Sequence, residues 1–172
     1  MKSTRRWAVS FLMLLFFWGL SIFPLTGEAA ARARTPAEVL YDEGVYFFNA
    51  YDYSSAFDRF SKAAEQGHIG AQFYLGVLTM AKDERQAAQW IHKAAEQGHA
   101  NAQFILAEMY EYGLGVAKDE QQAAHWYLKA AEQGLGSAQK KLSDMYLNGI
   151  GVAQDIQQSL YWRRKASSNP NW

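Results

Sequence analysis

The stretch Lys-Ala-Ala-Glu-Gln-Gly occurs three times, at Lys62–Gly67, Lys93–Gly98 and Lys129–Gly134, and a degenerate copy follows at residues 165–167. The first two copies start 31 residues apart, and each later copy starts 36 residues after the one before it. A period of this kind is typical of an array in which one supersecondary unit stacks on the next. The repeat therefore organises most of the chain.

Each repeat has the pattern of two helices joined by a loop. In each of the last three units an Asp is followed three residues later by a Gln, which is the spacing of a capping box, at Asp83, Asp119 and Asp155. In the third unit the second helix is expected to begin after Asp119. Ala123 and Trp126 then lie on one stripe of that helix, and Gly134 ends it. The pattern predicts an all-α fold, an α-solenoid of about four helix-turn-helix repeats.

The unit boundaries follow from the period. We expect repeats at residues 36–70, 71–101, 102–137 and 138–168, followed by a tail at residues 169–172. In the first unit, Thr35-Pro36 marks a helix start. The expected helices of this unit run to about residue 49 and from about residue 54 to residue 66. The second unit lacks the Gly-x-Gly-Val loop that the third and fourth units share, which explains its shorter period.

The N-terminal stretch has the pattern of a secretory signal peptide over residues 1–31. Basic residues at the start precede an apolar run at Trp7–Phe23, and small residues at Ala29–Ala31 offer a cleavage site. We therefore expect a periplasmic or secreted protein. An uncleaved membrane anchor is the alternative, since this run of 17 residues is at the short limit for a membrane span. In that case the chain meets the membrane only through this segment.

Composition excludes several function classes. The chain of 172 residues has 17 basic and 17 acidic side chains, whereas a general nucleic-acid binder usually presents an excess of basic residues, so we expect no nucleic-acid partner. The absence of cysteine excludes disulfides, thiolate metal sites and a cysteine nucleophile.

The pattern of residues 102–134 resembles the Sel1-like repeat, a longer-looped relative of the tetratricopeptide repeat. The first unit is more similar to the tetratricopeptide repeat itself. The resemblance implies a right-handed solenoid that binds other proteins, often as an adaptor in bacterial envelope or signalling complexes. Some cysteine-rich members are linked to penicillin or peptidoglycan, but this chain has no cysteine. The positions that carry the resemblance are Ala102, Leu106, Ala107, Tyr110, Gly113, Gly115, Val116, Asp119, Ala123, Trp126, Lys129, Ala130, Ala131 and Gly134.

The same resemblance implies that the first helix of each unit lines the concave, partner-binding face. The helical period places Leu106 and Met109 on the packed side, so the opposite arc is expected to meet a partner. Phe73 and Phe104 on that arc are expected to be exposed aromatic side chains, unless they pad the neighbouring repeat. The candidate partner-binding residues are Gln72, Phe73, Val77, Gln103, Phe104, Glu108, Glu111, Gln139, Lys140 and Asp144.

No arrangement of residues indicates catalysis. Trp90, Trp126 and Trp162 recur at one phase beside small residues, which favours a place in the core. The four histidines lie in separate positions without metal-site spacing, so we expect them in solvated turns or on helix surfaces. We expect no catalytic residue, cofactor or metal. We expect the protein to be a non-catalytic protein–protein adaptor or scaffold in the bacterial envelope. The alternative is a peptidoglycan- or β-lactam-directed envelope enzyme or a glycan-binding protein.

Overall fold

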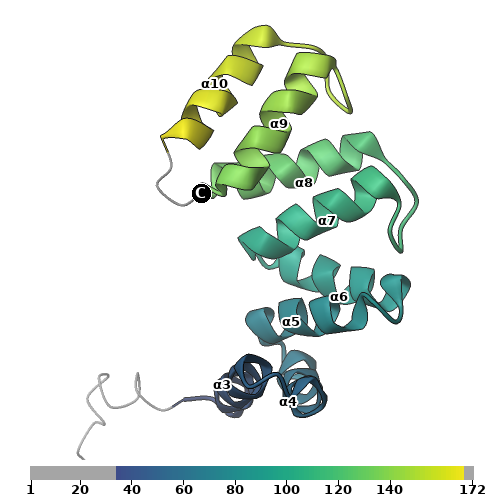
Figure 1. The fold of residues 1–172 in the computed structure, drawn as a ribbon, viewed down its shortest axis with the longest axis vertical. Helices are drawn as coiled ribbons and strands as arrows, with labels where there is room; N and C mark the ends of the chain where they lie inside the picture. Colours follow the sequence, from purple (N-terminus) through teal and green to yellow (C-terminus); the bar gives the residue numbers. More distant parts are fainter. Residues whose placement is uncertain (1–33, 169–172) are drawn as a thin grey trace, which may run out of the picture. The chain divides into compact units, whose positions relative to one another are not determined.

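The computed structural model describes residues 34–168, and all the regular structure in this range is helical (Figure 1). The predicted signal peptide at residues 1–31 and the tail at residues 169–172 lie outside it. No helix within residues 34–168 is long and apolar enough to cross a membrane. The helices are α3 (Pro36–Asn49), α4 (Tyr53–Glu65), α5 (Ile69–Thr79), α6 (Glu84–Glu96), α7 (Ala100–Tyr112), α8 (Glu120–Glu132), α9 (Gly136–Asn148) and α10 (Ile156–Ser167).

The helices form four hairpins that stack in chain order. The pairs α3–α4, α5–α6, α7–α8 and α9–α10 make the most extensive contacts, and the second helix of each pair also packs on the first helix of the next. In Figure 1 the hairpins follow one another from α3 to α10, which lie at opposite ends of the row. This is the predicted all-α solenoid, in which each repeat packs on its neighbours.

Aspartate caps start the second helix of every hairpin. Asp83 Oδ1 accepts a hydrogen bond from the Gln86 backbone amide at 3.0 Å, as the sequence predicts. Asp119 and Asp155 make the same contact in α8 and α10, and Asp52 caps α4 in the same way. Each cap satisfies an amide that the helix itself leaves unpaired, so these boundaries are set locally by the sequence.

The Gly-x-Gly-Val loop is the contact that requires glycine. Gly113 ends α7 in the left-handed region at φ 74°. Gly115 has φ 69° and lies against the backbone of Glu84, so closely that a Cβ atom there would overlap its carbonyl group. Gly151 lies in the same way on the backbone of Glu120. The loop therefore attaches the start of one second helix to the next repeat.

Small residues from the repeated stretch lie in the core. Ala94, Ala95, Ala130 and Ala131 are all buried, since they lie where helices approach closely. One core cluster runs through the last three hairpins, and a second joins the first hairpin to α5 and Trp90. The expected core position is confirmed for Trp126 and Trp162, which are both 6% exposed, whereas Trp90 is half-buried against the second cluster.

Candidate protein-binding groove

A hollow of about 470 Å³ lies between the first helices of the third and fourth hairpins, α7 and α9. It combines an apolar lining with charged side chains, and it includes four of the residues predicted from the sequence to meet a partner. We call this hollow the α7–α9 groove. Its lining residues are Phe104, Glu111, Ser137, Lys140, Lys141, Asp144, Met145 and Ile150.

The expected exposure of three candidate residues is wrong. Gln72, Gln103 and Gln139 are 4–5% exposed, so they do not form part of an accessible surface. Gln103 Nε2 donates to the carbonyl oxygen of Ala95 at 3.1 Å, and its Oε1 accepts a hydrogen bond from Gln133 at 2.7 Å. The side chain thus forms hydrogen bonds to the C-terminal end of α6, in the preceding hairpin, and to that of α8, in its own hairpin. It joins neighbouring repeats and does not face a partner.

The other seven candidates keep some exposure and differ in where they lie. Phe104, Glu111, Lys140 and Asp144 line the α7–α9 groove. The remaining three are half-buried on α5 and α7 outside that lining: Phe73, Val77 and Glu108.

Both candidate phenylalanines pack within the array while remaining half-buried. The Phe73 ring stacks on the His99 ring with centroids 4.5 Å apart, which connects α5 to the start of α7. Phe104 lies 5.5 Å from the ring of Tyr127 and contacts the main core cluster. Of the two, only Phe104 also lines the groove, where its accessible part supplies an apolar surface.

A hydrogen-bonded cluster holds one wall of the groove. Glu111 on α7 accepts hydrogen bonds from the Tyr127 hydroxyl on α8 at 2.5 Å and from Lys141 Nζ on α9 at 3.0 Å. Burial alone would raise the pKa of Glu111, but the bonds from Tyr127 and Lys141 outweigh it and lower this pKa. Burial and the bond to Glu111 raise the pKa of Tyr127 well above its usual range. At neutral pH the cluster is therefore a carboxylate, a phenol and an ammonium group.

We expect Tyr127→Phe to reduce the free energy of unfolding by about 1–2 kcal/mol, because the half-buried Glu111 carboxylate loses a charge-assisted donor while the ring stays in place. Urea unfolding followed by circular dichroism measures this change. The matched control is Tyr146→Phe, which alters a half-buried tyrosine of the same core cluster. Equal stability of wild type and Tyr127→Phe would contradict a role for the cluster in fixing α7 to α9.

Charged groups remain available at the groove. Lys140 is exposed and has no ion-pair partner within the described range. Asp144 lies 4.0 Å from Arg163, with both side chains more than half exposed, so this pair is weak. Glu108 lies near the groove on α7, where burial raises its pKa against the opposing charge of Lys141. A partner can therefore meet an unpaired cation and a weakly paired carboxylate beside an apolar floor.

The seams beside α5 and α7 contain histidine caps that the sequence interpretation did not identify. His68 Nδ1 accepts from the Ala71 amide and His99 Nδ1 from the Ala102 amide, each at 3.2 Å. The His68 ring also stacks on Tyr41 at 4.2 Å. Both histidines are half-buried, so their expected place in solvated turns or on helix surfaces is corrected.

We expect the array to lose stability as the pH falls below about 6.5, because a protonated Nδ1 cannot accept the capping hydrogen bond. Burial lowers the pKa of both His68 and His99, while Glu38 and Asp42 oppose the shift at His68. A lowered pKa means that the folded state binds fewer protons than the unfolded state, so this stabilisation is complete above the unfolded pKa and is lost below it.

The double variant His68→Asn/His99→Asn keeps an acceptor suited to capping but removes the titrating group. Urea midpoints measured from pH 5 to pH 8 are expected to fall more steeply for wild type than for this variant. The same slope in both proteins would rule out the histidine caps as the cause.

A lysine lies over the tryptophan ring in each of the last three repeats. Lys93 Nζ is 4.2 Å from the centroid of the Trp90 ring, and Lys129 Nζ is 4.4 Å from that of Trp126. Lys165 and Trp162 repeat the arrangement at 5.4 Å. The lysine of the repeated stretch thus contributes a cation–π contact along the second helices, away from the groove.

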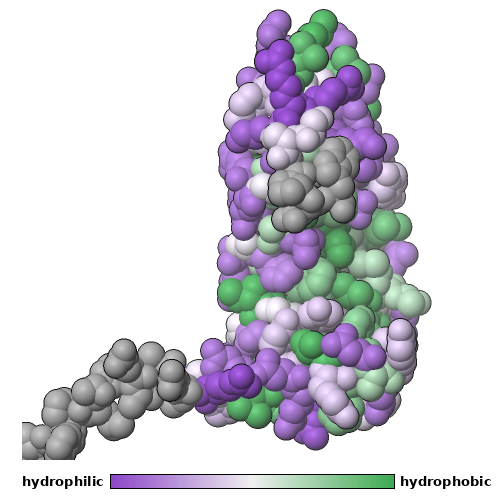
Figure 2. Space-filling model, turned by 60° about the vertical axis from the view of Figure 1, so that its left-hand side comes forward, coloured by the Kyte–Doolittle hydropathy of each residue, from purple (hydrophilic) through white to green (hydrophobic). Residues whose placement is uncertain are grey.

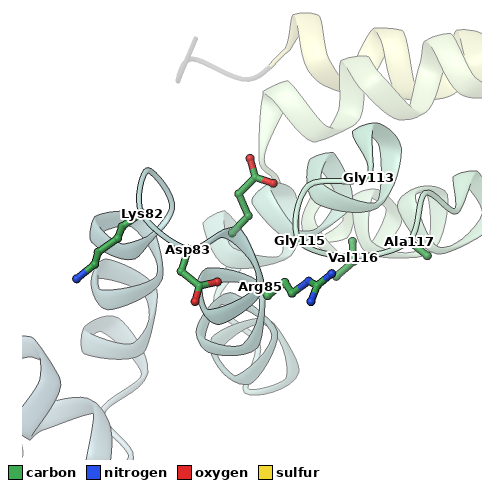
Figure 3. Close-up of a pocket in the computed structure, with 8 residues that line it drawn as sticks. Lys82, Asp83, Arg85, Gly113, Gly115, Val116 and Ala117 are labelled. Carbon is green, nitrogen blue, oxygen red and sulfur yellow. The ribbon is translucent and has the colours of Figure 1, made fainter.

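A second hollow, of about 670 Å³, lies where the Gly-x-Gly-Val loop meets the start of α6. Figure 3 shows Gly113, Gly115 and Val116 along the loop, with the Arg85 side chain extending toward Val116. Its geometry follows from the loop contact that joins two repeats. Within residues 34–168, no cluster of His, Asp and Glu side chains could hold a metal ion.

Four stacked helical hairpins with an accessible groove between first helices define the protein as a helical-repeat protein. The Sel1 repeat family model matches residues 39–68, 70–99, 100–135 and 136–171, which is most of the chain. The chain therefore belongs to the Sel1-repeat family. Sel1 repeats are protein-interaction modules, and proteins of this family are typically non-catalytic scaffolds.

Solved structures agree with this assignment. The protective antigen c5321 of uropathogenic Escherichia coli, which displays an SLR fold, is 34% identical with a TM-score of 0.75, over 86% of this chain and 33% of that one. A Sel1 repeat protein of Oxalobacter formigenes is 32% identical with a TM-score of 0.71, over 78% of this chain and 57% of that one. This chain thus spans less than two thirds of the length of either relative.

A third similarity concerns the fold alone. Cysteine rich protein B of Helicobacter pylori is 23% identical with a TM-score of 0.57, over 80% of this chain and 92% of that one. No protein in the curated set of sequences matches this chain.

Proposed function

We propose that this protein is an exported, non-catalytic adaptor of the bacterial envelope that binds another protein through the α7–α9 groove. The observation that carries the proposal is the placement of Phe104, Lys140 and Asp144 around one hollow between consecutive repeats. A half-buried aromatic side chain beside accessible charged groups suits a protein partner, since aromatic anchors supply much of the binding energy and charges set specificity.

Export and the place of action rest on the N-terminal sequence. The basic start, the apolar run at Trp7–Phe23 and the small residues at Ala29–Ala31 are the features of a cleaved secretory signal. N-terminal sequencing of the protein recovered from fractionated cells tests this part. A start near Arg32 in the envelope or medium fraction supports export, whereas an intact N-terminus in the cytoplasmic fraction contradicts it.

Reversal of the charge at Lys140 is expected to reduce partner capture by roughly tenfold, because Lys140→Glu places an acid where the groove presents its exposed cation. Affinity purification of the tagged full chain from its own cells, followed by quantitative mass spectrometry, measures the recovery of each co-purified protein. Lys82→Glu is the matched control, since Lys82 is also an exposed lysine but lies at the loop beside α6.

A protein that is recovered with wild type and with Lys82→Glu, but not with Lys140→Glu, is expected. Recovery of every partner at the same level in all three would contradict binding in the groove. Circular dichroism of the three proteins establishes that each is folded.

A further inference from the structure

The two ends of the helix row differ from its interior. On α7, Ala102, Leu106 and Met109 are at most 1% exposed. The register of α3 is fixed by Gly44, because a Cβ atom on Gly44 would meet Phe60 of the facing helix as one on Gly76 would meet Ile91. Each residue of α3 is therefore equivalent to the residue of α5 that lies 32 positions later in the sequence.

With this register, α3 presents to solvent the face that α5, α7 and α9 bury. Ala71 and Leu75 of α5 are 0% and 3% exposed, whereas their equivalents Val39 and Glu43 of α3 are both exposed. One turn further, Tyr46 is 70% exposed. All four first helices have a partner helix in their own hairpin, so the difference lies in the preceding hairpin, which the described residues before α3 do not include.

The outer face of α10 is exposed in the corresponding way. Ala124 and Ala131 of α8 are 4% and 1% exposed, because α9 packs on this helix. The equivalents of Ala124, Leu128 and Ala131 on α10, 36 residues later, are Leu160, Arg164 and Ser167, and all three are exposed. We call the α3 surface of Val39, Glu43 and Tyr46 the first end face, and the α10 surface of Leu160, Arg164 and Ser167 the last end face.

Each end face carries one charged residue, and the two are opposite in sign: Glu43 on the first end face and Arg164 on the last. The α3 helix contains three acidic residues and no basic one, at Glu38, Asp42 and Glu43. The α10 helix contains three basic residues and no acidic one, at residues 163–165. Terminal repeats need a polar outer face for solubility, but solubility does not require opposite signs at the two ends.

Apolar side chains accompany these charges. Val39 is 43% exposed on the first end face, and Leu160 is 39% exposed on the last. In Figure 2 hydrophobic side chains are visible on the surface at the α3–α4 end, between hydrophilic ones. An apolar contact surrounded by complementary charge is the usual composition of a protein interface.

We propose that copies of this chain associate head to tail, with the last end face of one copy on the first end face of the next. The occupant of each end face is thus a second copy, and the contact continues the interface that the array already uses between α8 and α9. Such a contact is heterologous, so each copy adds to the next in a chain that stays open unless the rotation between copies closes it into a ring, and its ion pair weakens with salt.

The internal interface supplies the register. Gln139 Nε2 bonds to the carbonyl oxygen of Ala131 at 3.1 Å, which sets α9 against α8. The equivalent positions at the two ends are Leu40 and Ser167. Leu142 lies one turn after Gln139 on α9, and its equivalent on α3 is Glu43. Leu128 lies one turn before Ala131 on α8, and its equivalent on α10 is Arg164. An apolar pair inside the array is thus matched by an acid and a base at its ends.

Glu43 and Arg164 are both available for an intermolecular ion pair. Glu43 pairs with Arg59 at 3.1 Å, but 46% of the Glu43 side chain is exposed. No ion pair of Arg164 occurs among residues 34–168. Both groups can therefore enter an intermolecular pair without the loss of a buried contact.

Cross-linking of the full chain tests the proposal, since the sequence contains no cysteine and each introduced thiol is the only one. Full-length Val39→Cys and Ser167→Cys carry different tags, are expressed together and are oxidised. We expect a covalent dimer that contains both tags, and no dimer when either variant is expressed alone. The control pair, Lys82→Cys with Ser167→Cys, places one thiol at the loop beside α6 and is expected to give background only.

Charge reversal then tests the ion pair. Addition of Glu43→Arg to the Val39→Cys chain is expected to reduce the yield of mixed dimer by roughly tenfold through like-charge repulsion. Addition of Arg164→Glu to the Ser167→Cys chain is expected to restore it. Restoration also shows that the variants are folded.

Three outcomes would overturn the proposal. They are a mixed dimer no more abundant than in the control pair, dimers of either single variant alone, and a yield that does not respond to the first reversal or does not recover with the second.

Discussion

The variant Gly115→Ala is expected to lose about 3 kcal/mol or more of its free energy of unfolding. Gly115 has φ 69°, a conformation that costs an L residue about 1–3 kcal/mol. An added Cβ atom would also overlap the backbone carbonyl group of Glu84, which no side-chain movement can relieve. The loop would have to leave the start of α6, and the contact between the second and third hairpins would be lost. Urea unfolding monitored by circular dichroism gives the value.

Gly98→Ala is the matched control, because it separates conformation from close approach. Gly98 has φ 90°, but a Cβ atom there would have no heavy atom within 4 Å. This substitution is expected to cost about 1 kcal/mol from the backbone conformation alone. If the two variants lost the same stability, the contact of the loop with Glu84 would contribute nothing.

The variant Trp126→Ala is expected to lose about 3–5 kcal/mol, the range for removing a large aromatic side chain from a core. Trp126 is 6% exposed and belongs to the cluster that runs through the last three hairpins. Its removal also takes away the ring on which Lys129 lies. Chemical unfolding at pH 7 measures the change in midpoint and slope.

Trp90→Ala provides the comparison within the same protein. Trp90 occupies the equivalent position one repeat earlier, with Lys93 over its ring, but it is only half-buried. Less apolar area returns to water, so the expected loss is smaller than for Trp126→Ala. A loss at Trp90 as large as that at Trp126 would contradict the argument from burial.

Local signals made most of the fold predictable. Asp83, Asp119 and Asp155 were expected to cap second helices, and each accepts the hydrogen bond that this role requires. The glycine at 113 ends α7, and the tryptophan stripe lies in the core as its phase predicts. Helix caps, C-terminal glycines and apolar helix faces depend on residues within one or two helical turns, so they can be predicted from a single sequence.

The width of the buried arc could not be predicted in the same way. The 3.6-residue period places Gln103 about 60° from Leu106, at the edge of the packed arc, and we predicted an exposed glutamine there. In the array, however, α7 packs against α8 of its own hairpin and against α6 of the preceding one. Two flanking helices bury a wider arc than one does, and they bury Gln103 with it. Its place between Ala95 and Gln133 joins residues that are 8 and 30 positions away.

The histidine caps and the groove also depend on contacts between hairpins. His99 caps α7 because Phe73, from the preceding hairpin, holds its ring by stacking. Lys141 reaches Glu111 across 30 residues of sequence, and this bond fixes one wall of the α7–α9 groove. The period placed Phe104, Glu111, Lys140 and Asp144 on the first helices, but only the stacking of α7 and α9 brings them around one hollow.

The most direct test of partner binding in the α7–α9 groove is photo-cross-linking in the native cells. A photoreactive amino acid is introduced into the full chain at Lys140, within the groove, or at Gln121, an exposed position in the first turn of α8. We predict a specific cross-link to another protein from position 140 and none from position 121. The absence of a cross-link at 140, or the same products from both positions, would contradict the proposed site.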